Sequence, residues 1–297
     1  MRRRPLLVLC PGRSFSSVVC TAIGQHPEMY DVPEIYLGLA GSVGALLDMA
    51  NEHGKKYLAY GLVRVIAQLH HHDQSEDSAQ AAWAWLREHR GWTTGQVYHY
   101  IAERIAPRRL VDKSPTHGRL ENLERLQATF PDAYYLHLLR HPRTNGHSLY
   151  QVHFKRLADW QPDQLPQLAR RVEQQWLKVH RNIFHFTGRL PPGRTMRIQG
   201  EQLLANPDLY FSQIAEWLEI RTDRAAIEAM KHPEHSPYAQ MGPPSAPYGN
   251  NQGFLEDPRL RIGLPFTGNL HDPLEWSEQG GCLSSETLAL ARQLGYR

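Results

Sequence analysis

A short loop near the start of the chain carries residue types that bind anions. The segment PGRSFSS (11–17) follows the apolar run PLLVLC and precedes SVVCTAIGQ, whose spacing predicts a helix. A strand that ends in a small-residue turn and opens a helix directs several backbone N–H groups, and the positive end of the helix dipole, at one point. The alternative is an ordinary helix start with an exposed arginine. We predict an anion-binding cradle, whose polar side chains are Arg13, Ser14, Ser16 and Ser17.

Two further segments offer the same chemistry. In LLRHPRTNGHS, Arg140 closes an apolar run, Pro142 ends it, and Ser148 falls about two turns into the helix that follows. Arg140 and Ser148 therefore suit a second phosphate group. In VDKSPTH, Lys113 ends another apolar run and His117 lies four residues later.

The first loop differs from the phosphate loop of ATPases. That loop requires the ending GK[ST], whereas Ser17 stands five residues after Gly12 and is followed by two valines. A nucleotide-dependent kinase of P-loop-like fold lacks this marker but remains an alternative. A non-catalytic nucleotide-binding module is the second alternative.

Four apolar runs of strand length must position these loops, and each is followed by a helical pattern. They predict an α/β fold, with a central parallel sheet flanked by helices. Residues 35–107 show only helical patterns, which we interpret as a helical insertion or cap. Residues 232–281, rich in Pro, Gly and Asn, are interpreted as a loop or lid, and the whole chain of 297 residues as a single domain. The four runs are PLLVLC, RRLVDKSP, AYYLHLLRHP and RTMRIQ.

Composition limits the partners. The chain has 33 Lys and Arg against 30 Asp and Glu, a balance that does not favour a nucleic-acid partner. The apolar run Leu6–Cys10 is too short for a signal peptide, and no segment is long enough to span a membrane. The three cysteines lack metal-ligand spacing, which suggests reduced thiols and a cytoplasmic protein. The sequence does not indicate an oligomeric state.

Together these residues resemble the sulfotransferases that use 3′-phosphoadenosine 5′-phosphosulfate (PAPS). That family grips the 5′-phosphosulfate with a strand, a basic residue beside small residues, and a helix, and PGRSFSS is similar, with Arg13 at the basic position. The family holds the 3′-phosphate with Arg-x-Pro and a Ser eight residues after the Arg, the spacing of Arg140, Pro142 and Ser148. VDKSPTH is similar to the family's Lys/Ser element.

The resemblance implies a P-loop-like sulfotransferase fold. It also implies an enzyme that moves a sulfuryl group from PAPS to a hydroxyl or amine of a small acceptor, without a metal. QHPEMYDVPE is similar to the bacterial and tyrosylprotein branches, in which an acidic residue, here Glu34, reaches the acceptor. Arg261 resembles the arginine of the family's late loop over the 3′-phosphate. Phe15 departs from the pattern because it stands where the family usually has Gly, which implies a wider loop or a ring that lines the acceptor pocket.

The implied mechanism is an in-line displacement in which protein charges stabilise the leaving oxygen. Arg13 and Lys113 are the candidates for that charge. Glu34 or His117 would take the acceptor's proton, and the resemblance favours Glu34. For His117 we expect the first turn of a helix, where the dipole would lower its pKa, or else an exposed position in which Ser114 merely caps the helix.

Other residues whose types suggest chemistry have simpler interpretations. His70, His71 and His72 are contiguous and point in three directions on a helix, so we expect a solvated helix end rather than a metal site. LLRHP resembles the signature of histidine phosphatases, but Pro142 replaces that family's glycine. A set of three helical tryptophans gives only an aromatic tendency to the acceptor, because such rings more often pack in a core; they are Trp83, Trp85 and Trp92.

Overall fold

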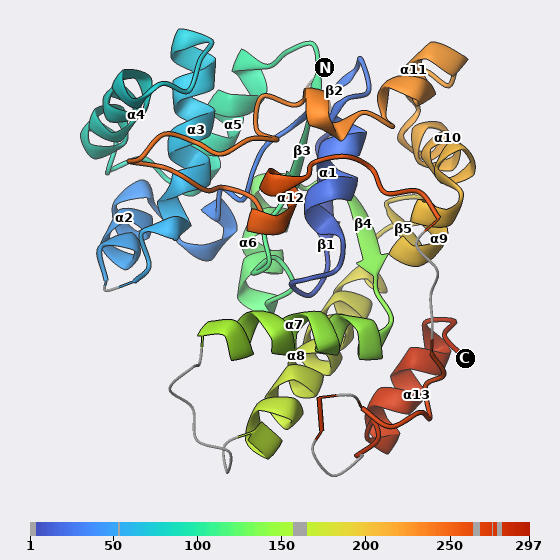
Figure 1. Cartoon of the computed structure of the whole chain (residues 1–297). Helices are drawn as coiled ribbons and strands as arrows, with labels where there is room; N and C mark the ends of the chain where they lie inside the picture. Colours follow the sequence, from blue (N-terminus) through green and yellow to red (C-terminus); the bar gives the residue numbers. More distant parts are fainter. Residues whose placement is uncertain (1–3, 53, 157–164, 264–267, 275, 278–280) are drawn as a thin grey trace.

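A five-stranded parallel sheet forms the centre of the protein (Figure 1), as seen in a computed structural model that describes residues 4–52, 54–156, 165–263, 268–274, 276–277 and 281–297. The strand order is β2-β3-β1-β4-β5, and every pairing is parallel. The predicted α/β fold is therefore confirmed. The strands are β1 (Leu6–Leu9), β2 (Met29–Asp31), β3 (Arg109–Lys113), β4 (Tyr134–Leu139) and β5 (Thr195–Gln199).

Helices cover both faces of the sheet. Alternate residues of a strand point to opposite faces, so one strand contributes to two apolar cores. Leu7 and Leu9 of β1 belong to one apolar core, which they share with helices of the insertion and with α6 and α8. Leu6 and Val8 belong to a second core on the other face. The helices of the first core are α2 (Val43–Asn51), α3 (Tyr57–His71), α4 (Glu76–Glu88), α5 (Thr94–Arg104), α6 (Leu120–Thr129) and α8 (Leu165–Thr187); those of the second are α1 (Ser16–Gly24), α9 (Gly200–Ala205), α10 (Pro207–Leu218) and α11 (Arg224–Ala229).

Between β2 and β3 the chain forms helices α2 to α5, which gather on one side of the sheet in Figure 1. The stretch LGLAGSVGALLDMA begins as a 3-10 helix (Leu37–Leu39) rather than an α-helix. Ser42 interrupts it, because its side chain accepts a hydrogen bond from the N–H of Ala45 and so caps α2. The α-helix is accordingly shorter than its apolar pattern predicts.

The C-terminal part combines short helices with long irregular segments. A 3-10 helix (Pro233–His235) leads into residues 236–251, which we call the strap. In Figure 1 this orange segment runs from the region of α11 towards α3 and α4, and returns to α12. The predicted loop at 232–281 is thus largely irregular where it is described, while 264–267, 275 and 278–280 lie outside the described residues. The remaining helices are α7 (Pro142–Arg156), α12 (Gln252–Glu256) and α13 (Ser285–Gln293).

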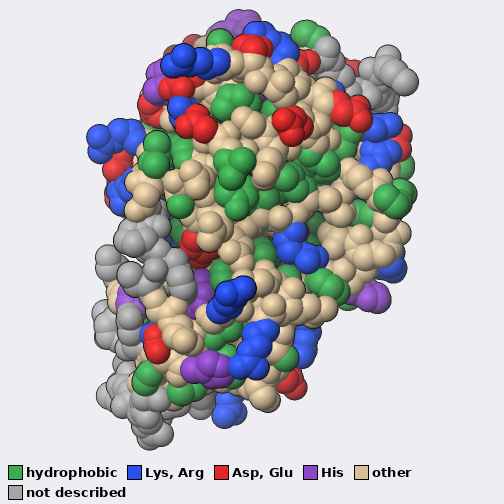
Figure 2. Space-filling view, turned by 90° about the vertical axis from the view of Figure 1, so that its right-hand side faces the viewer, with side chains coloured by type: hydrophobic (Ala, Val, Ile, Leu, Met, Phe, Trp, Pro, Cys, Tyr) green, Lys and Arg blue, Asp and Glu red, His purple; other side chains and the backbone are tan. Residues whose placement is uncertain are grey.

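The surface shows mixed charge. On the face seen in Figure 2, Lys and Arg side chains are interspersed with Asp and Glu rather than gathered into a field of one sign. Among the described residues, no helix combines the length and the apolar composition that a membrane span requires.

Candidate active site

Three loops meet where the central strands end. β1 lies between β3 and β4, with Val8 opposite Lys113 and Leu9 opposite His137. The loops that leave β1, β3 and β4 therefore begin side by side at the carboxyl edge of the sheet. Ligands of open parallel sheets bind at this edge.

The loop after β1 has an unusual backbone. Arg13 and Phe15 have positive φ angles of 66° and 62°, whereas Ser14 between them does not. Such alternation turns successive N–H groups to one side, the arrangement of an anion-binding nest. Within the described residues, no hydrogen bond has the N–H of Gly12, Arg13, Ser14 or Phe15 as its donor. A strained conformation of this kind costs about 1–3 kcal/mol per residue and is typical of functional sites.

Asn145 fixes the loop from α7. Its Nδ2 donates to the carbonyl of Gly12 at 2.9 Å and to the hydroxyl of the buried Ser14 at 3.1 Å. Ser16 is the first residue of α1. Of these two serines, Ser14 is thus engaged within the protein. Sequence reasoning missed Asn145 although it lies inside the segment that contains Arg140 and Ser148.

Two guanidinium groups gather beside the loop on its β4 side. Arg140 donates through Nη1 to the carbonyl of Arg13 at 2.6 Å and through Nε to Thr144 Oγ1 at 3.2 Å. Arg13 donates through Nε to Ser148 Oγ at 3.0 Å. Burial lowers the pKa of Arg13, and that of Arg140 to about 10. In the part of the chain that the structure describes, neither guanidinium makes an ion pair, so this cluster is suited to an anionic ligand.

Phe15 occupies the same side. Its ring lies against the guanidinium of Arg140, with 4.4 Å between the Arg140 Cζ and the ring centroid. The ring also packs on Gly200 at the end of β5, where an added Cβ would come within 2.5 Å of it. Because Arg140 and Gly200 follow β4 and β5, the ring packs away from β2 and β3. The contacts of the ring are thus on the β4–β5 side of the loop, while its place in an acceptor pocket stays a prediction.

On the β3 side, Lys113 joins the loop to Glu34. Its Nζ donates to Ser17 Oγ at 2.9 Å and to Glu34 Oε1 at 2.6 Å. The side chain of Lys113 is 1% exposed and that of Glu34 is 17% exposed. Tyr36 donates its hydroxyl to the other carboxylate oxygen at 2.8 Å. The structure therefore brings three predicted site residues together and adds Tyr36, which no sequence pattern selects.

His117 lies beneath this group and is fully buried. Helix α6 begins at Leu120, so His117 is in the preceding turn, and the prediction that it occupies the first helical turn is wrong. Its Nδ1 accepts the N–H of Ser114 at 3.3 Å, and its Nε2 lies 3.4 Å from Asp112 Oδ2. Burial, rather than a helix dipole, lowers its pKa. Since both ring nitrogens face protein atoms, Glu34 is the more accessible of the two predicted bases.

Backbone contacts hold Glu34 in place. Its N–H donates to the carbonyl of Gly249 in the strap at 2.5 Å. Gly61 of α3 passes so close that an added Cβ would lie 2.1 Å from the Glu34 carbonyl oxygen. The strap also reaches the loop, because the N–H of Asn251 donates to Ser17 Oγ at 3.4 Å. No local sequence signal identifies Gly61 or Gly249, since their role depends on the tertiary approach of α3 and the strap.

The remaining candidates lie apart from this group. Arg261 is 64% exposed and donates to Asp257 Oδ2 at 2.8 Å, and among the described residues it makes no hydrogen bond with Arg140 or Ser148. The three tryptophans pack against the first apolar core, where Trp85 and Trp92 contact each other. His70 pairs through Nε2 with the hydroxyl of Tyr100 at 2.6 Å.

A separate cavity of about 590 Å³ lies at the opposite edge of the sheet. Its lining includes Pro5, Pro107 and Ala133, which precede β1, β3 and β4 respectively. This cavity therefore opens at the amino ends of the strands, away from Arg13, Lys113 and Glu34.

Comparison with known proteins identifies the architecture. The sequence matches the model of the Sulfotransferase family over residues 5–224, a range that includes every site residue described above except Gly249, Asn251 and Arg261. The structure is similar to the sulfotransferase domain from the curacin biosynthetic pathway, with a TM-score of 0.78, 25% sequence identity, and coverage of 99% of this chain and 98% of that one. It is also similar to the sulfotransferase domain from the Synechococcus PCC 7002 olefin synthase (TM-score 0.74, 20% identity, 99% and 96% coverage). Curated protein sequences give no match.

Proposed function

Because this chain belongs to the sulfotransferase family, we propose that it transfers a sulfuryl group from PAPS to a hydroxyl or amine of a small acceptor. The observation that carries the proposal is the placement of cationic groups on both sides of one N–H-rich loop. Arg13 and Arg140 lie on the β4 side, and Lys113 lies on the β3 side. PAPS has two separate anionic groups, the 3′-phosphate and the 5′-phosphosulfate, which such an arrangement suits.

We assign the 3′-phosphate to Arg140 and Ser148. Both belong to the segment after β4, and both contact Arg13, which would lie between the two anionic groups. The loop N–H groups and the hydroxyl of Ser17 would bind the 5′-phosphosulfate. The assignment of Arg261 to the 3′-phosphate stays a prediction, since its contacts in this structure are with Asp257.

The residues on the β3 side suit the chemistry of transfer. PAPS supplies an activated sulfuryl group whose leaving oxygen becomes negatively charged as the bond to sulfur breaks. The ammonium group of Lys113, held by Ser17, lies beside the loop that would bind this oxygen and can stabilise its charge. Glu34 would accept the proton of the attacking hydroxyl or amine, with Tyr36 fixing the orientation of the carboxylate.

Nucleotide binding tests the donor assignment. We expect adenosine 3′,5′-bisphosphate, the product nucleotide, to raise the melting temperature without added metal, because it binds only the folded state. Arg140→Ala should weaken this nucleotide by about 10- to 100-fold, since a charge-assisted hydrogen bond contributes about 1.5–3 kcal/mol. Adenosine 5′-phosphosulfate lacks the 3′-phosphate and should lose little affinity. Calorimetric titration of both nucleotides measures the difference.

The control variant is Arg181→Ala, which removes an exposed arginine that pairs with Glu286 on another surface. It should leave both affinities unchanged. Equal losses for the two nucleotides in Arg140→Ala would contradict the placement of the 3′-phosphate. A melting shift that appears only with ATP and magnesium would instead indicate the kinase alternative.

A further inference from the structure

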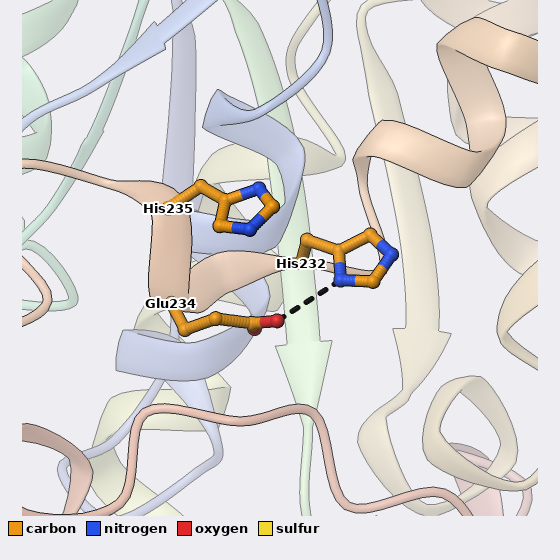
Figure 3. A group of neighbouring side chains, drawn as sticks. All are labelled: His232, Glu234 and His235. Carbon is orange, nitrogen blue, oxygen red and sulfur yellow. Dashed lines mark hydrogen bonds and ion pairs between the residues drawn. The ribbon is translucent and has the colours of Figure 1, made fainter.

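A group of metal-ligating side chains lies outside the site described above. His232, Glu234 and His235 extend from the short segment that links α11 to the strap, and they lie close together in Figure 3. One ligand atom from each residue falls within 4.8 Å of the other two. Within the described residues this is the one such group of three or more His, Cys, Asp and Glu side chains.

We propose that His232, Glu234 and His235 bind one divalent transition-metal ion of the zinc class. Two imidazoles and one carboxylate, with a fourth position left to water, form a common zinc ligand set. Zinc binds these atoms at about 2.0–2.2 Å, so two ligand atoms at a tetrahedral angle lie about 3.4 Å apart. Nδ1 of His232 lies 2.9 Å from Glu234 Oε1, and the limit of 4.8 Å for the group exceeds the ideal separation by only about 1.4 Å. Side-chain rotation can make up such differences.

The surroundings of His232 supply an independent observation. Metal-bound histidines usually direct their second ring nitrogen at a carboxylate, which fixes the ring. Here Nε2 of His232 lies 3.7 Å from Glu228 Oε1 on α11, while Nδ1 faces Glu234. Lys231 does not compete for Glu234, because its ammonium group binds Glu228 at 2.6 Å and Asp208 at 2.9 Å.

Glu234 and His235 complete the arrangement. Oε2 of Glu234 is buried and has no hydrogen-bond partner in the described part of the chain, a costly state for a carboxylate oxygen that a metal ion would relieve. The ring of His235 stacks on that of His232, with 5.1 Å between centroids and 13° between planes. The three side chains are half-buried or exposed, so an ion can reach them from solvent.

The position of this group gives the ion a structural role. Ser236 follows His235 directly, and its hydroxyl donates to the buried Asp31 at the end of β2 at 2.8 Å. From there the strap continues to Gly249 and Asn251, which contact Glu34 and Ser17. A metal ion would hold together the segment 232–235, from which the strap starts. The proposal does not depend on the identity of the sulfuryl donor.

Zinc alone is the probe for the test. The full chain, stripped of metal with a chelator, should bind one zinc ion per chain in a calorimetric titration, and zinc should raise its melting temperature. His232→Ala and His235→Ala should each weaken binding by more than the 10- to 100-fold that follows loss of an outer-shell partner. Glu228→Gln should weaken it by about that smaller factor. Cobalt substitution should give the visible absorption of a tetrahedral site, and His235→Ala should abolish it.

The matched control is His71→Ala, which removes an exposed histidine of α3 that is far in sequence from His232. It should leave zinc affinity unchanged. Melting temperatures without zinc establish that each variant folds. The proposal would be overturned if His232→Ala and His235→Ala bound zinc as tightly as the parent chain does. It would also be overturned if the parent chain bound no zinc at up to about 1 mM.

Discussion

The close approach of α3 to Glu34 makes Gly61→Ala an informative perturbation. The added Cβ would lie 2.1 Å from the carbonyl oxygen of Glu34 and 2.7 Å from its carbonyl carbon. Ordinary contacts of this kind exceed 3 Å, so the backbone at Glu34 must move by about 1 Å. Both partners of the clash are backbone, which rotation of a side chain cannot relieve.

Two effects of opposite sign set the stability of this variant. Overpacking of a core costs about 1–3 kcal/mol, while replacement of Gly by Ala inside a helix contributes up to about 1 kcal/mol. We expect a net loss of about 1–2 kcal/mol, which should lower the melting temperature by about 2–4 °C in a chain of this size. A misplacement of 1 Å at a reacting group costs about 100-fold in rate, so turnover should fall far more than stability.

Gly95→Ala provides the matched control. Gly95 also lies in a helix, α5, but its added Cβ would meet the side chain of Thr129 at 3.4 Å, an ordinary contact. This variant should be as stable as the parent or more stable, with unchanged turnover. Melting curves, steady-state rates and bisphosphate titrations separate the effects, because nucleotide affinity should survive in both variants. If Gly61→Ala matched Gly95→Ala in rate and stability, our description of how Glu34 is held would be wrong.

Other contacts give further expected outcomes. Phe15→Leu removes the ring stacked on Arg140 and should weaken the binding of adenosine 3′,5′-bisphosphate about 2- to 10-fold, as measured by calorimetry. Unchanged affinity would show that the ring does not position Arg140. Ser148→Ala should weaken the same nucleotide by a similar factor and spare adenosine 5′-phosphosulfate, which calorimetry also measures. Burial raises the pKa of Asp31 to about 7, so between about pH 4 and pH 7 the folded chain keeps a proton that the unfolded chain has lost, and this group's contribution to stability falls as pH rises. The difference in melting temperature between Asp31→Asn and the parent chain should therefore favour the variant more at pH 8 than at pH 5. The same difference at both pH values would refute the assignment.

Local sequence patterns were sufficient to predict four of the five strands of the sheet. β1, β3, β4 and β5 lie within the four predicted runs. β1 and β4 are buried at every residue, as expected of strands covered on both faces, whereas only Ile198 is buried in the edge strand β5. β2 was missed, since its three residues are too few to form a run. Its pairing with β3 creates the edge from which Glu34 extends.

The start of α6 shows why local signals fail near a site. Ser114 followed by Pro115 has the pattern of a helix cap and first turn. In the structure the hydroxyl of Ser114 accepts the N–H of Tyr36 at 3.2 Å, and among the described residues no N–H of the following turn donates to it. The helix begins at Leu120. The hydrogen bond joins residues 78 positions apart, so a local pattern does not reveal it.

The candidate site likewise combines residues that motif spacing predicts with contacts that it does not predict. Motif spacing selected Arg13, Lys113 and Arg140, and the sheet brings their loops together at one edge. Motif spacing did not predict the direct contact of Lys113 with Glu34, which joins residues 79 positions apart. Nor did it predict that Phe15 would adopt a left-handed conformation that favours glycine, with its ring packed on Arg140 and Gly200.

Single-turnover transfer from PAPS by Glu34→Gln tests the central claim most directly. Mass spectrometry of a panel of small alcohols and amines would first identify an acceptor that the parent chain sulfates. With that acceptor, we predict that Glu34→Gln loses about 10²- to 10⁴-fold in rate while it binds adenosine 3′,5′-bisphosphate as tightly as the parent chain. Transfer at the parental rate by Glu34→Gln, with loss of transfer in a nucleotide-bound His117→Ala variant, would contradict the account.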